Sequence, residues 1–100
     1  MESGMAGEPV RARVIFRGRV QGVGFRYTAT CLASSHDVTG YVMNRADGSV
    51  ELVAEGERAV VDAFVRAVSA AMARYVRGTE LAWAPATGEF PDFDVRFGGD

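Results

Sequence analysis

Residues 10–33 read VRARVIFRGRVQGVGFRYTATCLA, a stretch in which the spacing of the apolar residues changes once. In its first part Val10, Ala12, Val14 and Phe16 alternate with Arg11, Arg13 and Ile15, and a period of two predicts a strand with one buried face. After a glycine-rich loop that runs from Gly18 to Gly24, the spacing of Phe25, Ala29, Leu32 and Ala33 is typical of an amphipathic helix. We expect this helix to end near His36 and Asp37, with Asp37 as a left-handed stop.

The rest of the chain continues with the same kinds of element. We expect strands at 39–44, 49–55, 80–84 and 93–97, a hairpin turn at Asp47-Gly48, and a second helix at 57–75, with breaks at Gly56 and Gly78. The apolar face of this second helix is formed by Val60, Val61, Phe64, Val65 and Val68. This order predicts an α+β fold of the ferredoxin-like β-α-β-β-α-β type, in which two helices cover one face of an antiparallel sheet and a short extra strand follows at the C-terminal end.

Composition limits the classes of function. The chain has 100 residues, which suits one domain at 9–100 after a disordered N-terminal tail at 1–8. Its net charge of −2 argues against a nucleic-acid partner, and all 11 basic residues are arginine, so chemistry on a lysine amine is excluded. The single cysteine, Cys31, cannot form an intramolecular disulfide, and the sequence shows neither a membrane span nor a signal peptide. We expect a cytoplasmic monomer that does not bind a membrane.

The segment Gln21-Gly22-Val23-Gly24-Phe25-Arg26 joins the first strand to the first helix. Backbone N–H groups at a helix N-terminus attract anions, and glycines allow several of them to converge on one oxyanion. Arg26 lies in the first helical turn, where the helix dipole disfavours a positive charge by about 0.3–1 kcal/mol. A dianion held between the loop and the Arg26 guanidinium would explain this placement. From these residues alone, a tight turn followed by a surface arginine explains it equally well.

Asn44 is the only asparagine in the chain, and it lies near the end of the second predicted strand. Taken alone, it is best interpreted as a turn residue. The alternative is that its amide, with one acceptor and two donors at fixed angles, orients a water molecule beside a bound phosphate.

Two motifs in this order resemble the acylphosphatases. The similarity is carried by Gly18–Arg26, by Thr39–Asn44 with Asp47–Glu51, by Glu55-Gly56 and by Phe93–Phe97, and it runs from about Val14 to Phe97. It implies the ferredoxin-like fold and hydrolysis of carboxyl–phosphate anhydrides without a metal or cofactor. It also implies that Arg26 binds the phosphate and that Asn44 positions the nucleophilic water. We therefore expect the substrate to be a small acyl phosphate, the product to be inorganic phosphate, and the binding residues to be Gln21, Gly22, Val23, Gly24, Phe25 and Arg26.

The chain departs from the pattern of the acylphosphatases at three places. Tyr41 replaces a frequent tryptophan, Met43 replaces a frequent basic residue, and His36-Asp37 replaces a typical Leu-Gly helix exit. None of these positions is Arg26 or Asn44, so the departures bear on rate and substrate preference.

Two other interpretations stay open. A ferredoxin-like domain can bind RNA or a small anion without turnover, although the negative charge and the lack of an aromatic RNA-binding strand motif oppose RNA. Similar domains also begin larger hydrogenase-maturation proteins, where carbamoyl phosphate is the expected substrate, but this chain lacks the zinc-finger cysteines expected there. Cys31 and His36 alone cannot form a structural zinc site.

Overall fold

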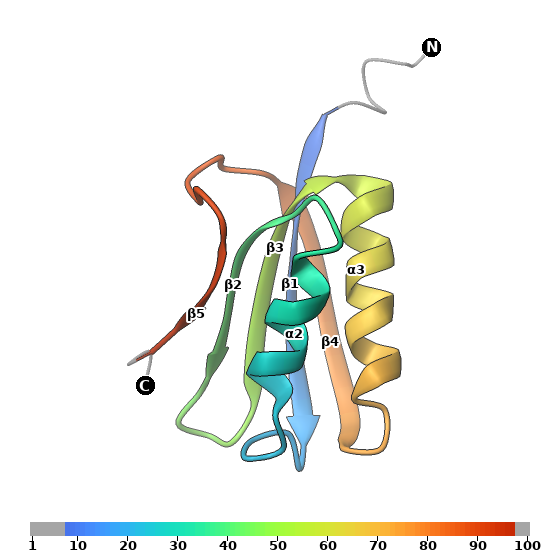
Figure 1. Ribbon diagram of the computed structural model, residues 1–100, viewed down its shortest axis with the longest axis vertical. Helices are drawn as coiled ribbons and strands as arrows, with labels where there is room; N and C mark the ends of the chain where they lie inside the picture. Colours follow the sequence, from blue (N-terminus) through green and yellow to red (C-terminus); the bar gives the residue numbers. More distant parts are fainter. Residues whose placement is uncertain (1–7, 98–100) are drawn as a thin grey trace.

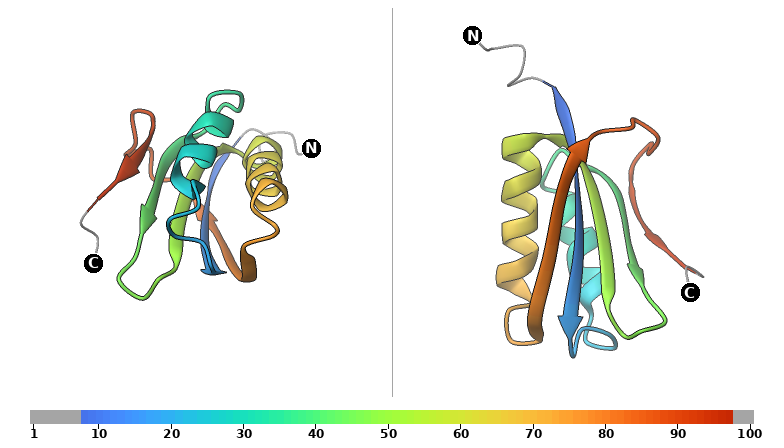
Figure 2. Two further views of the ribbon diagram at one scale, coloured as in Figure 1. Left: turned by 60° about the horizontal axis from the view of Figure 1, so that its bottom comes forward. Right: turned by 180° about the vertical axis from the view of Figure 1, so that it is seen from behind.

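The computed structural model describes residues 8–97, in which five strands and two helices form two layers (Figure 1). The elements are β1 (Pro9–Gly18), α2 (Phe25–Ala33), β2 (Thr39–Asn44), β3 (Val50–Glu57), α3 (Arg58–Ala71), β4 (Val76–Pro85) and β5 (Phe93–Arg96). Both helices cover the same face of the sheet, and no helix of the described residues lies on the other face (Figure 2). Neither helix in this range is long and apolar enough to cross a membrane. Apart from the exposed Glu8, the expected tail at 1–8 lies outside the described residues.

The strand order β4-β1-β3-β2-β5 confirms the ferredoxin-like arrangement. Four strands pair antiparallel, as predicted, while β5 pairs parallel with β2, so that Gly40 lies opposite Phe93 and the complete sheet is mixed. The parallel pairing follows from the chain path. Residues 86–92 carry the chain from β4 at one edge of the sheet to the far edge, where β5 enters at the end at which β2 begins.

The core lies between the helices and the sheet. Its fully buried side chains include Val14, Phe16, Val42, Leu52, Val61, Phe64 and Val68. The alternating apolar residues of β1 and the apolar residues of α3 therefore face the core, as predicted. Val60 is only partly buried, at the margin of the core. Removal of these apolar groups from water is the main force that holds the helices on the sheet.

The exit of α2 differs from the prediction. The helix ends at Ala33, and no residue other than glycine has a positive φ between 8 and 97, so Asp37 is not a left-handed stop. The hydroxyl of Ser34 donates to the carbonyl of Cys31 at 2.6 Å, and Ser35 donates to the next carbonyl at 3.0 Å. The backbone N–H groups of Ser34 and Ser35 donate to the same two carbonyls at 3.2 and 3.1 Å. The last turn therefore closes with hydrogen bonds between residues three apart, and no left-handed residue is required.

Two strands are longer than predicted, because β1 pairs with both of them over nearly its whole length. Gly56 and Gly78, predicted to break the chain, instead lie within β3 and β4, opposite Val10 and Arg17. Correspondingly, α3 ends at Ala71, well before the predicted end at 75.

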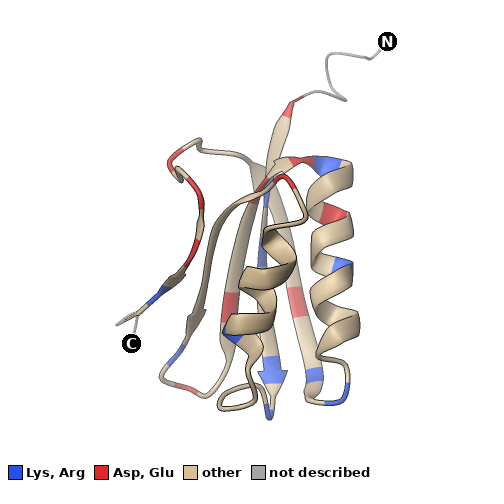
Figure 3. Ribbon diagram, in the orientation of Figure 1, with Lys and Arg blue, Asp and Glu red and all other residues tan. Residues whose placement is uncertain are grey.

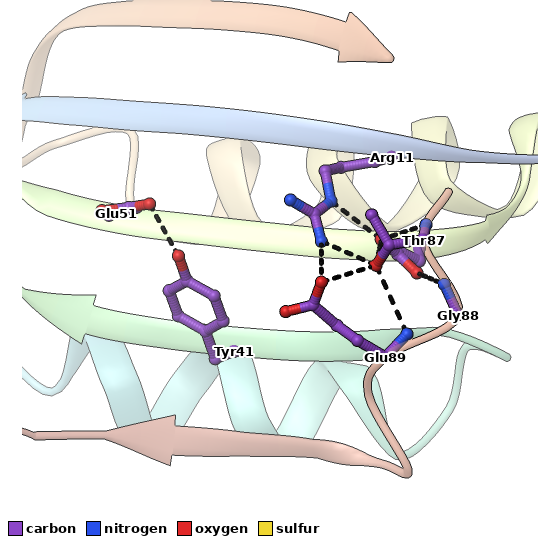
Figure 4. A network of polar contacts seen from close by, with 7 residues as sticks. Arg11, Tyr41, Glu51, Thr87, Gly88 and Glu89 are labelled. Carbon is purple, nitrogen blue, oxygen red and sulfur yellow. Dashed lines mark hydrogen bonds and ion pairs between the residues drawn. The ribbon is translucent and has the colours of Figure 1, made fainter. Parts of the chain in front are cut away.

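The face of the sheet away from the helices carries ion pairs, and residues 86–92 are attached to it. Arg11 Nε donates to Glu55 at 2.8 Å, and the same carboxylate accepts the backbone N–H groups of Thr87 and Gly88, both at 3.0 Å (Figure 4). Burial raises the pKa of Glu55, but the hydrogen bonds from Thr87, Arg11 and Gly88 outweigh burial and hold this pKa below its ordinary 4.5. The attachment positions β5, and β5 forms one wall of the site described next.

Candidate active site

The loop between β1 and α2 lies at the lower end of the molecule in Figure 1. Gly22 and Gly24 have φ angles of 77° and 81°, and a Cβ built on either residue would meet no atom within 4 Å. Glycine is therefore required there for the backbone angle rather than for space. Within residues 8–97, none of the backbone N–H groups of residues 21–26 donates to a backbone acceptor. The loop thus offers a series of N–H donors beside the positive end of α2.

Arg26 lies in the first turn of α2, as predicted. The helix starts after Gly24 with no side-chain cap and no acidic residue in its first turn. The guanidinium carbon of Arg26 lies 5.3 Å from the centre of the Phe97 ring, and no carboxylate between residues 8 and 97 forms an ion pair with it. The N-terminus of α2 and the Arg26 side chain therefore bring two sources of positive potential to one place.

A hydrogen-bonded clamp holds Asn44 beside this loop. Asn44 is the last residue of β2, and it is half-buried. The side-chain amide of Gln21 donates to the carbonyls of Arg45 at 2.8 Å and Ser49 at 2.9 Å, which ties the glycine loop to the hairpin after Asn44. Both N–H bonds of the Gln21 side-chain amide are therefore used by the hairpin. The group of Gln21 that stays available to an anion is its backbone N–H.

The hairpin itself is fixed by Asp47. The Asp47 carboxylate accepts hydrogen bonds from the hydroxyl and the N–H group of Ser49, and these bonds lower the pKa of Asp47 to about 2. Arg45 lies 3.7 Å from the same carboxylate. The turn that follows Asn44 is thus held by a charged network that is present across the physiological pH range.

Two adjacent cavities meet at the predicted catalytic side chains. One, of about 410 Å³, is lined by Gly22, Gly24, Phe25, Arg26, Tyr27, Thr30, Asn44, Val95 and Phe97. The other, of about 290 Å³, is lined by Gln21, Arg26, Asn44, Arg45, Ala46, Arg96 and Phe97. Arg26, Asn44 and Phe97 line both. Of the predicted binding residues only Val23 lines neither, because its side chain packs against the core.

Several lining residues were not predicted from the sequence. Tyr27, Thr30, Val95 and Phe97 line the larger cavity, and Arg45 and Arg96 line the smaller one. The only signal for them is indirect: Tyr27 follows Arg26 directly, and Val95 and Phe97 share one face of the last strand.

Among residues 8–97, no acidic side chain lines either cavity, which suits an anionic ligand. Basic positions gather at this end of the molecule, while acidic positions are more frequent at the opposite end (Figure 3). Arg96 lies with its guanidinium carbon 3.8 Å from the centre of the Tyr41 ring, so its side chain packs along the sheet. Arg26 is the basic residue that the two cavities share.

Among residues 8–97 there is no group of three or more His, Cys, Asp and Glu side chains placed to hold a metal ion. Cys31 lies beside the apolar residues of the first helix in the sequence, a position that predicts a packed thiol, but the structure exposes Cys31 on α2.

The fold and the two cavities define a small α+β domain that can hold an anion between a glycine loop, a helix N-terminus and an arginine. A family model described as Acylphosphatase matches residues 12–95. The chain belongs to the acylphosphatase family.

Three known proteins of this family are similar to this chain over almost their whole length. An acylphosphatase from Anaeromyxobacter dehalogenans is 45% identical over 89 residues, which covers 88% of this chain and 96% of that protein. One from Paenarthrobacter aurescens is 44% identical over 92 residues, covering 91% and 98%. The crystal structure of acylphosphatase from Bacillus subtilis superposes with a TM-score of 0.78 at 33% identity and covers 87% of this chain and 98% of that one.

Proposed function

We propose that Arg26 and the backbone N–H groups of residues 21–26 hold the phosphate of a small acyl phosphate, while Asn44 holds the attacking water. The reaction follows from the family: an acylphosphatase hydrolyses the bond between a carboxyl group and phosphate and releases a carboxylate and inorganic phosphate. The observation that carries the assignment is that Arg26 and Asn44 belong to different elements, α2 and β2, yet line the same two cavities beside the glycine loop.

The loop supplies the binding energy for phosphate. Its N–H groups lack backbone acceptors among the described residues, and the left-handed angles at Gly22 and Gly24 let successive groups point to one side. The guanidinium of Arg26 adds two parallel donors that match two phosphate oxygens. Negative charge on the equatorial oxygens of the transition state meets donors that are already in place, and a single such donor contributes about 10²–10³ in rate.

Asn44 contributes by placing the water. Its amide can accept a hydrogen bond from the water and thereby direct an oxygen lone pair at phosphorus, on the side opposite the departing carboxylate. The water oxygen bonds to phosphorus as the bond from phosphorus to the carboxyl oxygen breaks, and the electron pair of the broken bond leaves with the carboxylate. Both protons of the water stay with the phosphate, which is released as dihydrogen phosphate. A carboxylate is a good leaving group, so positioning rather than strong acid catalysis is the main requirement.

We also propose that the enzyme acts as a cytoplasmic monomer without a nucleic-acid partner. We propose a monomer, since Arg26, Asn44 and the glycine loop, which together make up the proposed site, are brought together by the fold of one chain. A single cysteine suits a reducing compartment, which supports a cytoplasmic location. The negative net charge supports an enzyme without a nucleic-acid partner.

Replacing Arg26 by alanine tests the site. We expect Arg26→Ala to abolish hydrolysis of benzoyl phosphate and binding of inorganic phosphate while leaving the unfolding transition in place, because the Arg26 side chain contributes no ion pair within residues 8–97. Hydrolysis is followed in the presence of EDTA, and the wild type is expected to stay active.

Arg66→Ala is the matched control, since it removes the same charge from an exposed position on α3 where Arg66 pairs with Asp62 at 2.8 Å. This control should hydrolyse benzoyl phosphate like the wild type. Activity retained in Arg26→Ala would overturn the site assignment.

A further inference from the structure

Exposed aromatic side chains gather at the larger cavity. Within residues 8–97, the large hydrophobic side chains that stand exposed are Tyr27 at 75%, Phe97 at 75% and Leu81 at 46%. Tyr27 and Phe97 both line the 410 Å³ cavity, although Tyr27 lies in α2 and Phe97 directly follows β5. Single exposed hydrophobic residues are common on proteins. Two aromatic residues from distant parts of the chain at one cavity, directly beside an anion-binding loop, indicate a ligand with an apolar part.

The rest of the cavity wall fits the same kind of ligand. Phe25 is a buried residue of its wall, and Val95 and Thr30 are half-buried there. Of the described residues that line it, Arg26 alone is charged. Once Arg26 holds a phosphate, the remaining surface therefore offers aromatic and aliphatic groups, one amide and hydroxyls, with no second cation.

The smaller cavity differs in charge. Arg45 and Arg96 line it in addition to Arg26, so an acyl group with its own negative charge would be drawn to that side. Both arginines are already engaged, however. Arg45 lies 3.7 Å from the Asp47 carboxylate, and Arg96 packs over the Tyr41 ring at 3.8 Å. The apolar cavity is therefore the better-formed place for an acyl group.

We propose that Tyr27 and Phe97 form an acyl subsite that selects acyl phosphates with an apolar, preferentially aromatic, acyl group. This inference rests on the proposed function, because it takes the phosphate to lie in the loop at residues 21–26. In this arrangement the substrate's ring packs against the Tyr27 and Phe97 rings while the carboxyl–phosphate bond lies between Arg26 and Asn44. Phe97 also contacts the Arg26 guanidinium, so it adjoins both parts of the substrate.

Selectivity, rather than activity, is the informative measurement. We compare the ratio of kcat/KM for benzoyl phosphate to kcat/KM for acetyl phosphate between variants, which cancels the intrinsic reactivity of the two substrates. Tyr27→Ser and Phe97→Ser should each lower this ratio by roughly 3- to 10-fold, the range that an aromatic pair contributes. Both side chains are mostly exposed, so both variants are expected to fold. Leu81→Ser is the matched control, since Leu81 is exposed on β4 and lines neither cavity; its ratio should equal that of the wild type.

Two results would overturn the acyl subsite and leave the proposed function intact. One is a ratio that stays unchanged in both Tyr27→Ser and Phe97→Ser while both substrates are still hydrolysed. The other is a higher kcat/KM for succinyl phosphate than for benzoyl phosphate, which would place the acyl group beside Arg45 and Arg96. Absence of hydrolysis of all three substrates by the wild type would instead contradict the proposed function itself.

Discussion

Asn44 and Arg26 line the same cavities, but the proposed chemistry gives them separable tasks. If Asn44 holds the water and Arg26 holds the phosphate, Asn44→Ala removes an interaction that matters for the reaction and not for phosphate binding. We expect kcat to fall by at least about 10²-fold, while inhibition by inorganic phosphate changes little. The measurement is kcat together with the inhibition constant of phosphate.

Thr39→Ala is the control for this substitution, because Thr39 is half-buried at the opposite end of the same strand. In Thr39→Ala, both kcat and the inhibition constant of phosphate should equal those of the wild type. If phosphate affinity in Asn44→Ala fell as far as the rate, Asn44 would be a ligand of the phosphate rather than the residue that holds the water.

At the residue scale, the sequence indicates the side chains that break a local rule. Arg26 stands out because its charge opposes the helix dipole, and Asn44 because no other asparagine occurs. Gln21 breaks no local rule, so nothing in the sequence marks its role. Its side chain bonds to carbonyls 24 and 28 residues further along the chain, and only the folded hairpin brings them within reach. Tyr27 and Phe97 likewise occupy ordinary positions until the fold places them at one cavity.

At the element scale, Gly40 decides how closely β2 can approach β3. A Cβ built on Gly40 would lie 1.9 Å from the carbonyl oxygen of Val53, and its φ is 140°. Since this neighbour is backbone, it cannot move without separating the strands. We expect Gly40→Ala to reduce the free energy of unfolding by at least about 3 kcal/mol, as judged by urea denaturation.

The comparison for Gly40→Ala is Gly78→Ala. Gly78 also lies in a strand, but its φ is not positive and a Cβ there meets nothing within 4 Å. This variant should unfold within about 0.5 kcal/mol of the wild type. Equal losses in the two variants would show that close approach to Val53 is not what requires glycine at position 40.

Glycines also show why element boundaries were harder to predict than element types. Gly56 and Gly78 carry the same local signal as Gly18 and Gly48, yet they lie inside strands. Pairing with β1 supplies hydrogen bonds that outweigh the low strand preference of glycine, and that pairing is not visible in a local pattern. The periodicity of β1 and α3 predicted their buried faces correctly. In both elements the residues that face the core recur at a regular spacing, and this spacing is visible in the local sequence.

At the scale of the whole molecule, residues 86–92 connect the two edges of the sheet and thereby complete the site. They lead into β5, which supplies Val95 and the approach to Phe97. Among the contacts that hold them, the carboxylate of Glu55 on β3 accepts the most hydrogen bonds. Glu55 is 4% exposed and accepts hydrogen bonds from Arg11, from both the N–H group and the hydroxyl of Thr87, and from Gly88. The wall of the active site therefore depends on a charge network on the opposite face of the sheet.

This dependence predicts how stability changes with pH. The pKa of Glu55 is lower in the folded protein than its ordinary 4.5, so ionised Glu55 stabilises the fold in full above pH 4.5, and this contribution is lost as the pH falls through the folded pKa. Glu55→Gln removes the charge and should lower the free energy of unfolding by about 2–3 kcal/mol at pH 7. Urea denaturation from pH 7 to pH 3 should show the gap between wild type and variant closing below pH 4.5.

The low pKa of Asp47, about 2, affects both proteins alike and cancels in the difference between them. Glu80→Gln is the matched control, because Glu80 forms an ion pair with Arg17 at 2.8 Å but remains 62% exposed. Since water screens such a pair, the loss at pH 7 should be small compared with that of Glu55→Gln. A gap for Glu55→Gln that stayed constant down to pH 3 would mean that hydrogen-bond geometry alone, and not the charge on Glu55, holds residues 86–92 across the sheet.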